Sequence, residues 1–97
     1  MPRLTLYHRS GCAESESARR VLERVRPYEP FDLEEVDINQ DRVAYGLHHD
    51  TAPVLKINGQ TVFRHRIDED RLIRRLRLVR QQLIAEEEER RRRGNSM

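Results

Sequence analysis

Apolar positions along the first third of the chain follow two different periods. Residues 3–8 alternate apolar and polar side chains and include β-forming residues, which predicts a short strand. From Ala13 the apolar residues recur at helical spacing, and Pro27 ends that pattern. The apolar stripe of this helix consists of Ala18, Val21, Leu22 and Val25. A strand followed by an amphipathic helix is therefore expected.

The pattern along the rest of the chain predicts a second strand and a short helix, followed by two strands that form a hairpin and by a long helix. Residues 33–38 favour a strand, and residues 42–47 favour one or two helical turns. Two β-rich runs flank Asn58-Gly59, a pair typical of a type I′ turn. The acidic residues 68–70 open a long helix, since negative charge suits a helix N-terminus. Its predicted buried stripe is Leu72, Ile73, Leu76, Val79 and Leu83.

This order of elements predicts an α/β domain. A strand, a helix and a strand, then a short helix, a hairpin and a closing helix, make a four-stranded mixed sheet with helices on its faces. With 97 residues, 36% of them hydrophobic, the chain can build one core and no second domain. We expect the domain at residues 1–85 and a charged helical extension and tail at residues 86–97. There, four glutamates precede four arginines at i, i+4 spacing, as in a solvated helix.

Charge composition narrows the classes of partner. Charged residues make up 37% of the chain, above the usual quarter or so, yet 19 basic and 17 acidic residues leave a net charge of only +2. No aromatic residues are interleaved with the arginines, so we expect no nucleic-acid partner. No stretch approaches the roughly 20 apolar residues of a membrane span. The four histidines lack paired ligand spacing, and no metal site is expected.

Cys12 is the only cysteine in the sequence. One cysteine excludes an internal disulfide and a structural zinc site that needs two cysteine ligands from this chain. A free thiol suits a reducing compartment, so we expect the cytoplasm, with an organelle matrix as the other possibility. Cys12 also falls between the predicted strand and the helix N-terminus. The helix dipole and Arg9 should favour its thiolate, while Glu14 and Glu16 should oppose it.

Several short motifs, in this order and spacing, resemble the glutaredoxin branch of the thioredoxin-like superfamily. The resemblance covers about residues 3–83. It implies a thioredoxin-like, glutaredoxin-type three-layer fold. The motifs that carry it are Leu4-Thr5-Leu6-Tyr7, Gly11-Cys12-Ala13-Glu14-Ser15, Val36-Asp37-Ile38, Thr51-Ala52-Pro53-Val54, Asn58-Gly59 and His65-Arg66.

The resemblance implies roles for the residues around the thiol. Cys12 takes the nucleophilic position, and Ser15 takes the second position of a monothiol Cys-x-x-Ser motif. Arg9 matches a basic residue that contacts a carboxylate of glutathione. Thr51-Ala52-Pro53 matches the family's cis-proline motif. There the backbone N–H and C=O of Ala52 would pair with glutathione or a substrate strand.

At the other end of the implied glutathione site, Asp68 is the nearest candidate for the residue that binds the γ-glutamyl group of glutathione. The resemblance thus implies a small thiol–disulfide oxidoreductase that works through a glutathione mixed disulfide on Cys12. Glutathione or another low-molecular-weight thiol would be its co-substrate. A bridging iron–sulfur cluster is not expected, because Ala13-Glu14 replaces the middle pair of the motif that holds one.

The expected partners are glutathione and glutathionylated or disulfide-bearing proteins, acted on by a monomer. A second interpretation stays open, in which the chain is a non-catalytic binding or adaptor protein that kept the fold and lost the redox chemistry. The absence of a resolving cysteine favours it.

Overall fold

The computed structural model of the chain describes residues 1–94, and their elements follow the predicted order. The second strand ends one residue earlier than expected, because Ile38 begins a 3₁₀ turn. No helix within this range is both long and apolar enough to cross a membrane. The elements are β1 (Arg3–His8), α1 (Ala13–Val25), β2 (Asp32–Asp37), η1 (Ile38–Gln40), α2 (Arg42–His48), β3 (Val54–Ile57), β4 (Gln60–Arg64) and α3 (Glu69–Gly94).

The four strands form one mixed sheet in the order β2-β1-β3-β4. Strand β1 runs parallel to β2 and antiparallel to β3, and β3 pairs antiparallel with β4. The predicted hairpin is confirmed: Asn58 and Gly59, at φ of 51° and 83°, both take the left-handed conformation that the turn requires. The central position of β1 places its carboxyl end, where the chain turns toward Cys12, between two neighbouring strands.

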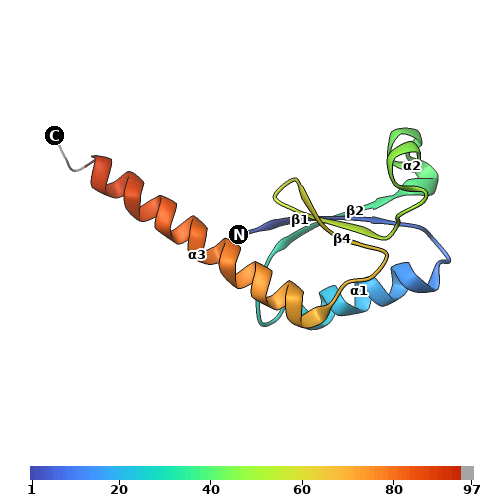
Figure 1. Cartoon of the computed structure of the whole chain (residues 1–97), viewed down its shortest axis with the longest axis horizontal. Coiled ribbons are helices and arrows are strands. Elements are labelled where there is room, and N and C mark those ends of the chain that lie inside the picture. The colour runs from blue at the N-terminus through green and yellow to red at the C-terminus, as the bar shows by residue number, and fades with distance from the viewer. Residues whose placement is uncertain (95–97) are drawn as a thin grey trace.

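Three layers result, as the thioredoxin-like fold requires. Helices α1 and α3 lie on one face of the sheet and α2 on the other (Figure 1). Alternation along the strands directs one set of residues to the α1 and α3 side, where they are almost fully buried. Burial of one such leucine contributes about 1.5–3 kcal/mol. This core includes Leu4, Leu6, Leu55 and Ile57 of the sheet, Ala18, Val21, Leu22 and Val25 of α1, and Leu72, Leu76 and Val79 of α3.

Helix α3 is longer than the sheet that it covers. Its 26 residues make a helix of about 39 Å, whereas a six-residue strand spans about 20 Å. The prediction that Leu83 belongs to the buried stripe is therefore wrong: its apolar spacing continues past the end of the sheet, and the residue is 39% exposed. The helix runs without interruption through the expected boundary at residues 85 and 86 and projects from the domain (Figure 1).

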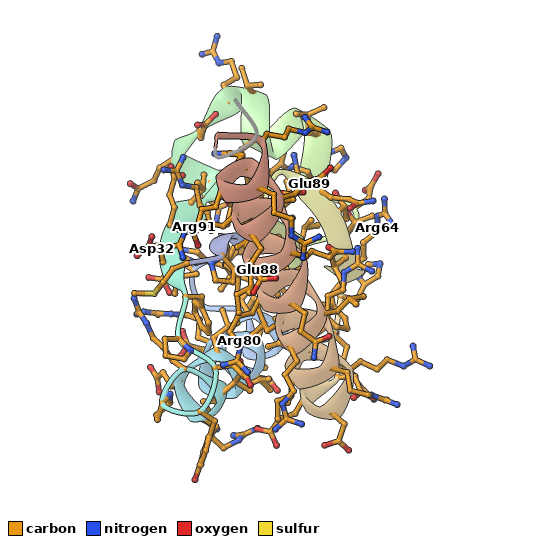
Figure 2. The ribbon with its side chains drawn as sticks, turned by 90° about the vertical axis from the view of Figure 1, so that its left-hand side faces the viewer. Asp32, Arg64, Arg80, Glu88, Glu89 and Arg91 are labelled. Atoms are coloured by element: carbon orange, nitrogen blue, oxygen red, sulfur yellow. The ribbon has the colours of Figure 1, made fainter. Side chains whose placement is uncertain are left out.

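The projecting part of α3 is a charged helix. Of the four expected i, i+4 pairs, two lie within 4 Å in the described part of the chain: Glu87 with Arg91 at 3.6 Å and Glu89 with Arg93 at 3.0 Å. Figure 2 shows Glu88, Glu89 and Arg91 on this exposed end of the helix. Residues 95–97, the end of the expected tail, lie outside the described residues.

Glu29, which sequence reasoning did not single out, connects α1 to α3. It lies in the bend after α1 and is only 5% exposed. Its Oε1 accepts a hydrogen bond from Arg77 Nε at 3.1 Å, and its Oε2 forms an ion pair with Arg80 Nη1 at 3.2 Å. The carboxylate is buried, while both guanidinium groups remain half in water. Glu29 therefore gains one charge-assisted hydrogen bond and one ion pair without the burial of three charges. Glu29 therefore fixes α3 at the point where the helix leaves the domain.

We predict that Glu29→Ala lowers the free energy of unfolding by about 1–2 kcal/mol, because one charge-assisted hydrogen bond and one ion pair are lost and the arginines return to water. Urea denaturation measures the change. The matched control is Glu16→Ala, which removes an exposed carboxylate 3.5 Å from Arg19 and should cost less than about 0.5 kcal/mol. Equal losses in the two variants would contradict the assigned role of Glu29.

Candidate functional site

A tight turn carries the chain from the end of β1 into α1 and places Cys12 at the helix N-terminus. The Cys12 N–H donates to the Arg9 carbonyl at 3.3 Å and closes the turn. Gly11 occupies its third position at φ of 77°, which a residue with a side chain rarely adopts. Cys12 is the N-cap residue of α1 and is extended, with φ of −94°. Its half-buried thiol therefore sits beside the unpaired N–H groups of the first helical turn.

Ser15 holds this turn against the helix. The side chain is 1% exposed, and its Oγ accepts a hydrogen bond from the Arg9 backbone N–H at 3.0 Å. A hydroxyl that accepts in this way keeps its own proton free to donate. The serine in the Cys-x-x-Ser motif thus has two neighbours: the backbone before the turn and the sulfur after it.

The first turn of α1 favours the ionised form of Cys12. The pKa of the thiol is lowered, first by the backbone N–H of Ser15 and further by the N–H of Glu14 and the hydroxyl of Ser15. Partial desolvation and the Glu14 carboxylate act in the opposite direction and are outweighed. The chemical consequence is a larger thiolate fraction, and the thiolate is the nucleophilic form of cysteine.

The Arg9 side chain lies elsewhere than the sequence suggested. Its Nη2 donates to the His49 carbonyl at 2.8 Å, just past the C-terminus of α2. The groups with the largest effect on the Cys12 pKa belong to the first turn of α1, and the Arg9 guanidinium is not one of them. The buried Nε of Arg9 has no hydrogen-bond partner within residues 1–94. Arg9 therefore ties the turn before the thiol to α2.

The cis-proline segment sits at the same end of the sheet. The Ala52–Pro53 peptide bond is cis, and Pro53 is buried. The His65 N–H donates to the carbonyls of Thr51 at 3.1 Å and Pro53 at 2.7 Å, with His65 in the left-handed region at φ of 66°. These bonds join the loop before β3 to the loop after β4.

One expectation about this segment is wrong. Ala52 was expected to offer both its N–H and its C=O to an extended ligand, but its N–H already donates to the His48 carbonyl at 2.8 Å. The Thr51 N–H donates to the same oxygen at 3.1 Å. The reason is local, because His48 is the last residue of α2 and its carbonyl has no partner inside the helix. The Ala52 carbonyl, in contrast, accepts no hydrogen bond within residues 1–94 and is therefore the one backbone group of Ala52 that stays free for a ligand.

A groove of about 300 Å³ runs between the first turns of α1 and the segment before α3. Glu14 contributes a negative charge to it and Arg66 a positive one. Asp68 is not part of its lining; its Oδ1 accepts from the Arg71 N–H at 3.0 Å and caps α3. The groove is lined by Ala13, Glu14, Ser17, Ala18, His65, Arg66 and Ile67.

Sequence reasoning missed the groove-forming role of Ser17 and the backbone role of His65. The His65-Arg66 pair carried part of the resemblance, and its place before the last helix was the available signal. His48 also gains a definite position, with its ring 4.2 Å from that of Tyr7. The pKa of His48 is lowered by desolvation, and further by the charges of Lys56 and Arg64. No cluster of three potential metal ligands occurs within residues 1–94.

This chain is similar to a curated protein in sequence and to solved proteins in structure. The Glutaredoxin-like protein YDR286C homolog of Dictyostelium discoideum is 32% identical over 90 residues, covering 86% of this chain and 83% of the relative. The X-ray structure of target protein XcR50 from X. campestris matches at 25% identity with a TM-score of 0.65, over 77% of this chain and 96% of that one.

A solved structure of a malarial protein has the same fold, with a TM-score of 0.60 at 14% identity over 75% of this chain and 90% of that one. The model of the Glutaredoxin-like domain (DUF836) matches residues 3–77, from the first residue of β1 into α3. That stretch contains the Cys12 turn, the cis-proline segment and the groove between α1 and the segment before α3. The chain therefore belongs to the glutaredoxin-like domain family (DUF836).

Proposed function

We propose that this protein is a monothiol thiol–disulfide oxidoreductase that uses glutathione, or a similar small thiol, as its co-substrate. The observation that carries the proposal is the position of Cys12: a half-buried sulfur at a helix N-terminus, with a lowered pKa. A thiol that only filled space in the core would be enclosed by apolar side chains, and its pKa would be raised.

The reaction has two exchange steps. The Cys12 thiolate attacks the glutathione sulfur of a protein–glutathione mixed disulfide; a Cys12–glutathione disulfide forms, and the protein leaves as a thiolate that takes up a proton. A second glutathione, as its thiolate, then attacks the glutathione sulfur on Cys12. Oxidised glutathione leaves, and Cys12 returns as the thiolate. Ser15 cannot resolve the first intermediate, because a hydroxyl does not take the place of a second thiol.

The Ser15 hydroxyl has a role in both steps. Cys12 is the nucleophile in the first step and the leaving group in the second, and a group that stabilises its thiolate favours departure. The groove that begins at Ala13, the residue after Cys12, supplies charges of both signs through Glu14 and Arg66, which suits a zwitterionic tripeptide. The free Ala52 carbonyl remains as an acceptor for one backbone N–H of that ligand. In this proposal the second carboxylate oxygen of Asp68, the one that does not cap α3, binds the γ-glutamyl group of glutathione. Arg9 and Thr51 shape the loops around the site.

We also propose the partners, the oligomeric state and the compartment of this reaction. The partners are glutathione and proteins that carry glutathione mixed disulfides, and the protein acts as a monomer in a reducing compartment such as the cytoplasm. No metal or iron–sulfur cluster takes part in the two exchange steps.

A second candidate function is a non-catalytic adaptor with the same fold. The hydrogen bond from the Ala52 N–H to His48 favours it, because this bond removes one of the two backbone groups that would orient an incoming disulfide. The two candidates differ in the fate of Cys12: an adaptor binds partners whether or not the sulfur is present.

We predict that oxidised glutathione adds one glutathionyl group to the reduced protein, and that reduced glutathione removes it. The thiolate of Cys12 provides the attacking sulfur, so Cys12→Ser forms no adduct and loses all detectable reduction of a glutathionylated test protein. Intact-mass spectrometry measures the adduct, and coupled glutathione reductase measures turnover. Cystine in place of oxidised glutathione tests another small disulfide. An adduct that reduced glutathione leaves in place would count for the adaptor.

We predict opposite effects of two neighbouring substitutions on the Cys12 pKa. Glu14→Gln removes a charge that raises this pKa, so the thiolate persists to lower pH and alkylation below the midpoint becomes faster. Ser15→Ala removes a hydrogen bond to the thiolate, so the midpoint rises. The pH dependence of iodoacetamide alkylation measures both.

Glu16→Gln is the matched control for these two variants. It removes a carboxylate one helical position beyond Ser15 that is not among the groups setting the Cys12 pKa. Its midpoint should match that of the wild-type protein. Midpoints that move in the same direction for Glu14→Gln and Ser15→Ala would refute the assignment of these two groups.

A further inference from the structure

A second groove, of about 560 Å³, lies between strand β4 and helix α3. It shares no residue with the groove beside Cys12. Its lining combines apolar side chains from both elements with three arginines of α3. These residues are Val62, Phe63, Arg71, Arg74, Arg75 and Leu78.

The three arginines carry uncompensated positive charge. Within residues 1–94, Arg71, Arg74 and Arg75 have no carboxylate within ion-pair distance, and Arg75 reaches only the Gln60 Oε1 at 3.4 Å. On the same helix, Arg77 and Arg80 are both paired with the buried Glu29. The spacing of i, i+3 and i+4 places the three unpaired guanidinium groups on one side of α3, the side that faces the groove.

Apolar surface lies beside these charges. Leu78 is 47% exposed, although it follows the arginines at the next turn of the same side of the helix. Val62 and Phe63 of β4 are only partly buried, and they pack against the core at the floor of the groove. A ligand for this groove therefore needs both acidic and apolar groups.

Strand β4 adds a third feature, because it is the last strand of the sheet and has a paired neighbour on one side only. The opposite edge of such a strand carries backbone N–H and C=O groups that can pair with an added strand. An extended segment placed there would alternate its side chains between the two faces of the sheet. Those on the α3 face would lie over the groove.

We propose that this groove and the free edge of β4 form a docking surface for an acidic, strand-forming segment of a partner protein. Backbone hydrogen bonds to β4 hold the segment, its apolar side chains cover Val62, Phe63 and Leu78, and its carboxylates pair with the arginines. An apolar floor beside a strand edge fits a peptide and not the phosphate backbone of a nucleic acid. The proposal is independent of the thiol chemistry at Cys12.

The test uses the full chain and a fluorescein-labelled ten-residue peptide of the repeat Glu-Thr-Val-Thr, called the Glu-Val peptide, which as a strand places Glu and Val on the same face. Fluorescence anisotropy is the readout. The wild-type protein should bind this peptide, and a Lys-Val peptide of the same pattern should not bind. Arg71→Ala with Arg74→Ala should weaken binding about tenfold, through the loss of two exposed charge pairs. Arg90→Ala with Arg92→Ala is the matched control on the projecting part of the helix, and it should leave binding unchanged.

Strand addition is tested separately from charge. Replacing two valines of the Glu-Val peptide by proline should abolish binding, because proline cannot donate a ladder hydrogen bond. Amide hydrogen exchange of β4 should slow in the complex. Equal binding of the proline peptide, or equal loss in the Arg90 and Arg92 control, would overturn the proposal.

Two other occupants would also overturn it. Self-association of the protein in analytical ultracentrifugation, abolished by Arg74→Glu, would assign the groove to a second copy of the chain. Binding to phosphatidylglycerol vesicles without binding to the Glu-Val peptide would assign it to a lipid surface.

Discussion

The partly buried hydrogen bond between the Arg9 backbone N–H and Ser15 Oγ is the contact on which the candidate site depends. It joins the end of β1 to the first turn of α1 and so fixes the intervening turn, in which Gly11 supplies the left-handed conformation. Cys12 follows as the N-cap residue, beside the N–H groups that favour its thiolate. One serine thus sets both the position of the sulfur and part of its acidity, the two properties that the proposed monothiol reaction needs.

Helix α3 is longer than the sheet, and this difference in length determines which charged side chains of the helix are exposed to solvent. The core holds the helix as far as Val79, and Glu29 holds it through Arg77 and Arg80. Beyond that point the ion pairs Glu87–Arg91 and Glu89–Arg93 run along the helix itself. The arginines before that point therefore divide into two groups, those that pair with Glu29 and those that face β4 unpaired. This division separates a structural role from the docking surface that we propose.

Most of the fold follows from local signals in the sequence. The alternation of β1, the stripe of α1 and the Asn58-Gly59 turn each depend on neighbouring residues, so they could be predicted. Leu83 could not, because the helical pattern continues while the sheet ends, and sheet length depends on distant strands. The hydrogen bond of the Ala52 N–H could not be predicted either, because its partner is a carbonyl at the end of α2 whose position depends on the fold. Ser15 was recognised from its motif, but its bond to Arg9 needed the folded turn.

The central claim is that the first turn of α1 makes Cys12 a reactive thiol. The most direct measurement is the ultraviolet absorbance of the thiolate in the reduced wild-type protein as a function of pH, with Cys12→Ser as the blank. The account predicts a midpoint below that of a free cysteine, about 8.5. A midpoint at or above that value would show that the helix N-terminus does not activate the thiol, and would contradict the account.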